Sequence, residues 1–347
     1  MPRVAVAVAL LAASACGRID FDGTPGPDAT VTPDACPACA AFQPVVGGCT
    51  DADAGPFQLA GTAPTQGGGY GVWVAPPFIL RADTTGGLHS LAFDGATFTQ
   101  LDALPNLGWV EAVWSEGSTL FVGAPGTGLA AVDLSPTGEL ALITQDTGTL
   151  KEARRGWAAG DTLYVPTGGS GLHAVRWDGT TLTPIGTALP TVGWAQSAWA
   201  RGTRVLFADA NALRVVDFDG STFNEPVPRD TTHPGTSRVW SDGTTIFVAH
   251  GSGATAYRIV GNALVELDSY TTTDAARDIW SDGYHVFVAA QSAGLIALRF
   301  ANDTFTLVDT IATGTQALGV FGDGTYVYSN DLAGGLRAHT GFRCQRW

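Results

Sequence analysis

Residues 238–249 read RVWSDGTTIFVA, and forty residues later the chain repeats the pattern as DIWSDGYHVFVA, residues 278–289. The aromatic residue of this pattern recurs at seven positions: Trp73, Trp114, Trp157, Trp199, Trp240, Trp280 and Phe321. Successive copies lie 40 to 43 residues apart. A fixed period of this length is the sequence signature of a repeat architecture, so the repeat decides the fold.

Each copy of the repeat predicts four short antiparallel strands. The aromatic strand and its F-V-A partner are followed by a third strand such as GLHSLAF and a fourth such as DTFTLVD. Asp-Gly pairs at residues 94–95, 178–179 and 219–220 separate the last two strands, because Asp and Gly suit tight hairpin turns. Valine, isoleucine, threonine and aromatic residues fill the strands. Four strands in about 40–45 residues are typical of a β-propeller blade.

The two ends of the repeat region predict how the ring closes. The seventh copy stops after three strands, at GGLRAHTGF, whereas residues 56–67, PFQLAGTAPTQG, read like a fourth strand that belongs to no preceding copy. We therefore predict an all-β, seven-bladed β-propeller with four-stranded antiparallel blades, whose last blade is closed by an N-terminal strand. Closure of the ring removes exposed strand edges.

Within the pattern, W-S-D-G is interpreted as scaffolding. The large aromatic side chain is expected to fill the gap between adjacent blades, and Ser-Asp-Gly to turn the first strand into the second. The charged residue of this turn varies in other copies, which carry Glu116, Asp161 or Arg201 at or near the same place. A catalytic carboxylate is not expected in near-copies around a ring.

The start of the chain predicts export. Residues 1–15 combine one arginine, an apolar run and small residues before Cys16, which is the pattern of a secretory signal peptide. The segment resembles a bacterial lipoprotein signal, which implies lipidation of Cys16, although Ala13-Ser14-Ala15 also fits an ordinary signal-peptidase site. Residues 16–50 are expected to hold the lipidated cysteine, a flexible tether rich in Asp, Pro and Thr, and a cysteine cluster, and residues 51–347 the propeller.

Four further cysteines, Cys36, Cys39, Cys49 and Cys344, suggest two disulfides in an exported chain, with all three pairings open. A Cys49–Cys344 bridge would staple the ring closure and contribute about 4–5 kcal/mol. The zinc interpretation of the C-P-A-C stretch lacks a second half with matching spacing. Residues 51–55, DADAG, lack most of a calcium loop. We therefore predict no metal site and no cofactor.

A family resemblance follows from the third strands. Residues 128–136, GLAAVDLSP, carry Gly-Leu, Val-Asp and Ser-Pro elements, and residues 212–217, ALRVVD, carry the Val-Asp element. The chain resembles the LVIVD-type propeller repeats of bacterial surface proteins from residue 56 to its C-terminus. The resemblance implies a lipid-anchored protein of the cell envelope, at the outer membrane or cell surface, or otherwise a secreted one, with a binding or scaffolding role. It supplies no catalytic residues.

Charge indicates where a ligand could bind. The chain has a formal net charge of -14, which argues against nucleic acid and leaves the lipid anchor as the expected link to a membrane. Five of its 18 basic residues nevertheless fall just before the first strands of blades, at one rim of the central channel. The candidate ligand-binding residues in these segments are Trp109, Glu111, Arg154, Arg155, Trp194, Arg238, Arg277 and Asp278. Lys151 and Gln196 lie in the same segments, and His250, Gln291, Asn330 and Asp331 are expected to open on the same face.

These residues leave several functions open. A local excess of arginine suits an anionic or carbohydrate-like ligand, and Trp109 and Trp194, both five residues before a repeat aromatic, could provide stacking faces. Alternatively, the arginines simply form ion pairs that line the channel. We predict a non-enzymatic, surface-anchored monomer that binds an unknown protein or glycan. A propeller enzyme acting on polysaccharide (a lyase or glycosidase) and a purely structural envelope lipoprotein are the alternatives.

Two chemical observations weigh on the enzyme alternative. Glu111 and Asp278 are the only acidic pair expected at the rim, and they belong to non-adjacent blades, whereas glycosidases need two carboxylates close together. The six histidines fall on different blades, so they are interpreted as packing residues rather than metal ligands. His89 and His173 occupy equivalent third-strand positions. No catalytic residue is assigned.

Overall fold

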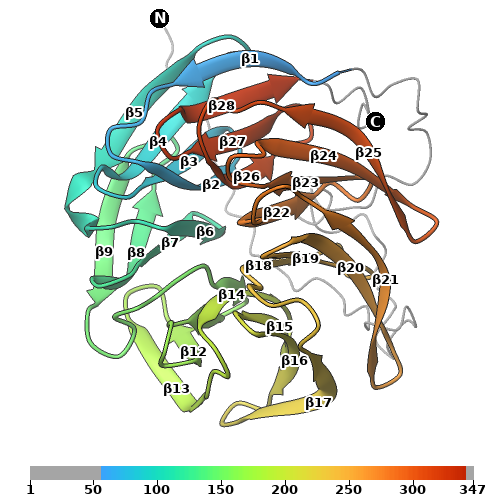
Figure 1. The fold of residues 1–347 in the computed structure, drawn as a ribbon. Helices are drawn as coiled ribbons and strands as arrows, with labels where there is room; N and C mark the ends of the chain where they lie inside the picture. The colour runs from blue at the N-terminus through green and yellow to red at the C-terminus, as the bar shows by residue number, and fades with distance from the viewer. Residues whose placement is uncertain (1–55, 341–347) are drawn as a thin grey trace, which may run out of the picture. The chain divides into compact units, whose positions relative to one another are not determined.

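The computed structural model describes residues 56–340, in which 28 strands form seven four-stranded antiparallel sheets (Figure 1). The described residues contain no α-helix; a single 3-10 turn, η4 (Pro105–Leu107), precedes the second blade. The predicted seven-bladed, all-β propeller is confirmed. The proposed signal peptide, the tether and all five cysteines lie outside the described residues.

The blades follow one another in chain order, and their strands run from the channel outward. Blades 1 to 4 consist of β2 (Gly69–Ala75), β3 (Phe78–Asp83), β4 (Gly87–Phe93) and β5 (Phe98–Leu104); β6 (Ala112–Glu116), β7 (Thr119–Ala124), β8 (Gly128–Leu134) and β9 (Leu140–Asp146); β10 (Trp157–Ala159), β11 (Thr162–Pro166), β12 (Leu172–Trp177) and β13 (Leu182–Leu189); β14 (Ala195–Arg201), β15 (Arg204–Asp209), β16 (Ala212–Phe218) and β17 (Phe223–Asp230). Blades 5 to 7 consist of β18 (Arg238–Ser241), β19 (Ile246–His250), β20 (Gly253–Val260) and β21 (Ala263–Thr271); β22 (Asp278–Ser281), β23 (His285–Ala289), β24 (Leu295–Ala301) and β25 (Thr304–Ile311); β26 (Ala317–Gly322), β27 (Val327–Asp331), β28 (Gly335–Thr340) and β1 (Gln58–Ala63).

The ring closes as predicted. Strand β1 pairs antiparallel with β28, from Gln58 opposite Thr340 to Ala63 opposite Leu336, and so supplies the outer strand of blade 7 (Figure 1). The closing strand is also held to its neighbour, because the amide of Phe57 donates a hydrogen bond of 3.0 Å to Oδ2 of Asp309 in blade 6. Blade 7 is therefore assembled from both ends of the propeller region. Whether Cys49 and Cys344 reinforce it stays a prediction.

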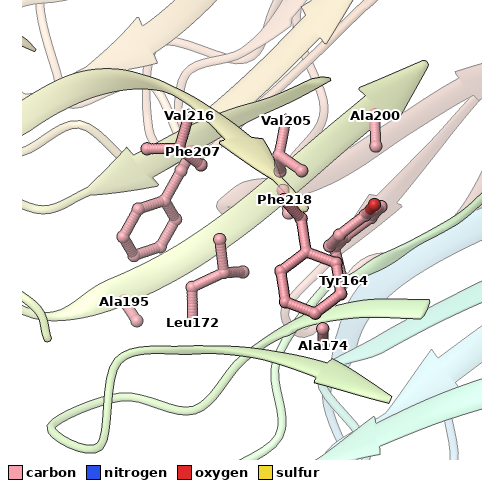
Figure 2. Close-up of a cluster of buried hydrophobic side chains, with 10 residues drawn as sticks. Tyr164, Leu172, Ala174, Ala195, Ala200, Val205, Phe207, Val216 and Phe218 are labelled. Atoms are coloured by element: carbon pink, nitrogen blue, oxygen red, sulfur yellow. The ribbon is translucent and has the colours of Figure 1, made fainter. Parts of the chain in front are cut away.

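Neighbouring blades pack through apolar side chains. Between blades 3 and 4, Tyr164 and Leu172 face Phe207 and Phe218 in a cluster of buried residues (Figure 2). Phe207 is fully buried and Phe218 is 4% exposed. Burial of each such side chain contributes about 1.5–3 kcal/mol, so contacts between blades are a main source of stability.

The aspartate of W-S-D-G is a turn residue. Oδ1 of Asp242 accepts the amide hydrogens of Thr244 and Thr245, both at 2.8 Å. Asp282 and Asp323 do the same in blades 6 and 7. The carboxylate therefore satisfies backbone donors that the tight turn leaves unpaired. The predicted role of Ser-Asp-Gly in turning the first strand into the second is confirmed.

The aromatic residues themselves differ in part from the prediction. Trp114 does fill the gap between adjacent blades, since a side chain at Gly156 of blade 3 would approach its ring to 2.8 Å. Trp73, Trp157, Trp240 and Phe321 instead meet one another at the axis, across non-adjacent blades. Ring centroids lie 5.9 Å apart for Trp73 and Trp157, 5.6 Å for Trp157 and Trp240, and 5.6 Å for Trp240 and Phe321.

We call the seven repeat aromatics the aromatic layer. Six of them form one connected cluster, because Trp199 adds to Trp157 and Trp280 adds to Phe321. The residues reach across the axis because the innermost strands lie close together. A side chain at Gly319 of blade 7, for example, would come within 2.3 Å of the carbonyl oxygen of Tyr70 in blade 1. The aromatic layer therefore fills the centre of the ring with side chains.

Candidate functional site

Two residues before each aromatic, the inner strands contribute a second ring of side chains. We call it the ion-pair layer: Gly71, Ala112, Arg155, Ser197, Arg238, Asp278 and Gly319. All seven are buried. Four are small, and the other three carry the only charges of the layer. The sequence analysis named these three, Arg155, Arg238 and Asp278, as candidate ligand-binding residues.

Asp278 is the centre of the ion-pair layer. Its Oδ1 accepts a hydrogen bond from Nε of Arg238 at 2.9 Å, and its Oδ2 accepts one from Nη1 of Arg155 at 3.0 Å. The backbone amides of Ile279 and Val320 complete the set at 2.9 and 3.1 Å. Because Arg155 belongs to blade 3 and Asp278 to blade 6, one of these bonds crosses the axis of the propeller.

The ion-pair layer lies directly on the aromatic layer. The guanidinium of Arg155 stands 5.4 Å from the ring centroid of Trp73 and 5.8 Å from that of Phe321, which is cation–π geometry. Burial lowers the pKa of Arg155 to about 10, against the opposing effect of Asp278, so the side chain stays charged at neutral pH. These three predicted ligand residues are thus bound to one another inside the protein, which is the ion-pair alternative of the sequence analysis.

One residue further from the aromatics lies a third ring, which we call the channel mouth: Tyr70, Glu111, Arg154, Gln196, Ser237, Arg277 and Leu318. Five of the seven are partly or fully exposed, and only Glu111 and Leu318 are buried. Nη1 of Arg154 donates to both carboxylate oxygens of Glu111, at 2.8 and 2.9 Å, and to Oε1 of Gln196 at 3.2 Å. Arg154 therefore links blades 2, 3 and 4. Arg277 is exposed and reaches Oε1 of Gln291 at 3.4 Å.

The charges of the mouth act on one another. Burial raises the pKa of Glu111, and the positive charges of Arg154, Arg238 and Arg277 oppose this effect. Burial also raises the pKa of Tyr70, with a further contribution from Glu111 and the same three arginines opposing. Tyr70, Glu111 and the arginines therefore form one electrostatic cluster, and Tyr70 brings a phenol into it.

Tryptophans flank the mouth. Trp109 is 54% exposed and Trp194 is 42% exposed, large fractions for such a large apolar side chain. The ring of Trp194 lies over Gly168 and Gly169 of blade 3, where any side chain would approach it to 2.8 and 3.4 Å. The guanidinium of Arg154 stands 5.9 Å from the same ring. Trp194 is thus held in place while much of its surface faces solvent, as a stacking platform requires.

Some residues that were expected on this face are buried in the blades. His250 is 2% exposed, and Asn330 and Asp331 are fully buried, so of the predicted loop residues only Gln291 reaches the mouth. The expected separation of the histidines was wrong in one case, because the rings of His233 and His250 stack with centroids 4.5 Å apart. His89 is 1% exposed, and burial lowers the pKa of both His89 and His173.

Residues 56–340 contain no group of three or more His, Cys, Asp or Glu side chains placed to hold a metal ion. They also contain no helix long and apolar enough to cross a membrane.

Three residues of the mouth were not predicted from the sequence: Tyr70, Ser237 and Leu318. Their signal is positional, since each lies three residues before a repeat aromatic, in register with Glu111, Arg154 and Arg277. Lys151 lies nearby and is exposed. Counted over the ion-pair layer and the mouth, four arginines face two carboxylates, an excess of positive charge in a chain whose formal net charge is -14.

Solved structures share the fold at low sequence identity. The β-propeller domain of Cps50 (Swd1) from Myceliophteria thermophila matches with a TM-score of 0.66 at 10% identity, over 82% of this chain and 99% of that chain. The WD40 β-propeller domain of Doa1 matches with a TM-score of 0.64 at 10% identity, over 82% and 97%. Virginiamycin B lyase from Staphylococcus aureus matches with a TM-score of 0.63 at 12% identity, over 82% and 98%.

These likenesses show the propeller fold alone. No protein-family model matches the sequence, and no curated protein matches it either. The resemblance to LVIVD-type repeats therefore rests on the third-strand residues quoted above.

Proposed function

We propose that this protein is a non-enzymatic binding protein whose channel mouth takes an anionic oligosaccharide. The observation that carries the proposal is the reversal of charge at the mouth, between two exposed tryptophans. Arginines suit carboxylate or sulfate groups, and tryptophan faces stack on sugar rings. A ligand that combines negative charge with flat apolar sugar faces matches both features.

The carboxylates of the mouth and of the ion-pair layer favour binding over catalysis. Glu111 is held by Arg154 at two oxygens, and Asp278 is held by two arginines and two backbone amides. A general acid or base must reach the proton that it transfers. Both carboxylates are instead occupied by partners within the protein, so their role here is to hold the arginines in place.

The wider setting is also a proposal and rests on the sequence alone. Residues 1–16 support export and a lipid anchor at Cys16, which would hold an LVIVD-type propeller at the bacterial cell envelope. Mass spectrometry of the mature N-terminus tests the anchor. A diacylglyceryl-modified Cys16 is expected, and an unmodified one would show that the protein is released by ordinary signal peptidase.

Titration calorimetry with two hexasaccharides of equal length, hexagalacturonate and maltohexaose, tests the binding proposal. Wild-type protein should prefer the anionic ligand, and its affinity should fall as salt rises, because screening weakens charge contacts at an exposed site. Trp194→Ala and Arg277→Ala should each weaken binding by about tenfold, the equivalent of one lost contact worth about 1.4 kcal/mol.

Arg176→Ala is the matched control. The side chain of Arg176 is 59% exposed and belongs to blade 3, near the turn at the opposite end of the blade. Its loss should leave affinity unchanged. Equal affinity for both hexasaccharides would contradict a role of charge in binding. Cleavage of hexagalacturonate, detected by chromatography, would favour the enzyme alternative.

A further inference from the structure

A cavity of about 530 Å³ opens between blades 6 and 7, away from the axis of the propeller. Its walls come from the loop between β23 and β24, from the end of β25 and from the connection between β25 and β26. The residues that line it are Ser292, Ala293, Thr310, Ala312, Thr313, Gly314, Thr315 and Gln316. Its volume lies within the range of about 300–1,000 Å³ that is usual for small-molecule sites.

The walls offer both a hydrogen-bond donor and a hydrogen-bond acceptor. Oγ1 of Thr315 accepts the amide hydrogens of Ala333 and Gly334 at 3.3 and 3.1 Å, which leaves its own hydroxyl hydrogen to donate. The hydroxyl of Ser292 donates to Oδ2 of Asp274 at 2.5 Å, which leaves its oxygen to accept. A hydroxyl that can donate and one that can accept suit a ligand that itself carries hydroxyls.

A positive charge lies behind one wall. A side chain at Gly314 would come within 2.7 Å of Nη2 of Arg337, so the guanidinium lies directly beneath this glycine. Nε of Arg337 is 3.0 Å from Oδ2 of Asp331. Burial raises the pKa of Asp331, so this carboxyl gives up its proton less readily than an exposed aspartate does.

Gln291 connects one wall of the cavity to the channel mouth. Ser292 of its wall follows Gln291, whose side chain contacts Arg277 of the mouth and donates to Oδ1 of Asp274 at 3.2 Å. Gln316 of its floor precedes β26, whose first residue, Ala317, exchanges backbone hydrogen bonds with Gln291 at 3.0 and 3.1 Å. An extended ligand bound at Arg277 would therefore lie beside the residues that form the wall of the cavity.

We infer that the cavity between blades 6 and 7 is a second subsite, which takes a terminal, carboxylate-bearing sugar unit of the oligosaccharide bound at the mouth. This inference rests on the proposed function. It assigns a length preference to the ligand, because an oligomer must be long enough to span from the tryptophans of blades 2 and 4 to blades 6 and 7.

A series of oligogalacturonates from trimer to decamer tests the inference by titration calorimetry. Wild-type affinity should rise in a step at the length that first reaches the cavity. Ala312→Trp fills the cavity from an exposed position and should abolish this step, a loss of about tenfold for the decamer, while affinity for the trimer stays unchanged. Thr310→Tyr fills the cavity from the end of β25 and should act alike. Thermal unfolding checks that both variants fold.

The outcomes separate the two proposals. If both filled variants bind the decamer as tightly as wild type while Trp194→Ala weakens every length, the cavity is no subsite and the mouth still binds. If wild type binds no length, the proposed function fails and the subsite fails with it. A step that disappears in Ala312→Trp and Thr310→Tyr but persists in Trp194→Ala supports the subsite directly.

Discussion

Arg154 and Arg155 are neighbours in sequence, yet they belong to two different regions of the propeller. Arg155 lies in the buried ion-pair layer, 5% exposed, bound to Asp278 on the far side of the ring. Arg154 lies in the channel mouth, with its guanidinium against Glu111 and Trp194. One position in the segment before β10 therefore separates a buried side chain that joins blades 3 and 6 from one that lies at the open mouth.

The difference follows from strand geometry. Residues two before the repeat aromatic lie above the aromatic layer, where seven strands converge and only small or paired side chains fit. Residues three before it lie at the open end of the strands, where different side chains are accommodated. In this ring, the number of residues between an arginine and the repeat aromatic indicates whether its side chain is buried or exposed. The residue type alone does not.

The largest effect is expected for loss of Asp278. Asp278→Ala leaves Arg155 and Arg238 buried without a counter-charge and should lower the free energy of unfolding by about 3–5 kcal/mol. Chemical denaturation measures this directly. The matched control is Asp217→Ala, which removes a pair with Arg204 whose side chains are 34% and 30% exposed, and which should cost about 1 kcal/mol or less. Equal losses for the two variants would contradict the distinction between the layers.

An intermediate effect on stability is expected at Asp331, which, like Asp278, is a fully buried aspartate. Asp331 has Arg337 as its ion-pair partner, and burial raises its pKa to about 7, above its value of about 3.9 in an unfolded chain. The folded state therefore favours the protonated form. This contribution is complete below about pH 4 and is lost as pH rises to about 7. Wild type should lose stability over this range relative to Asp331→Asn, measured as denaturation midpoints, and parallel pH profiles would contradict the raised pKa.

The smallest effect on stability is expected at the mouth. Arg277→Ala and Trp109→Ala change exposed side chains, so the free energy of unfolding should stay within about 0.5 kcal/mol of wild type. The same variants should still weaken hexagalacturonate binding. A large loss of stability in either would place the residue with the ion-pair layer instead.

Much of the fold could be predicted because the repeated residues act within their own blade, in its inner strand and the turn that follows. Trp240, Asp242 and Gly243 recur since every blade needs the same inner strand and turn, and residues 56–67 matched a missing fourth strand. The contacts between side chains at the axis could not be predicted, because they join blades that are distant in sequence. Arg155 pairs with Asp278, and Trp73 packs against Trp157. Tyr70 was missed for the same reason, as its charged neighbours all come from other blades.

The bond between Arg155 and Asp278 also limits how this protein can change its number of repeats. Propeller genes can gain or lose a blade by duplication or deletion, since each unit contacts mainly its neighbours. Here an added blade would widen the ring and separate side chains that meet across it, leaving charges buried without partners. The copy number of seven is therefore set by contacts at the axis as well as by the contacts between adjacent blades.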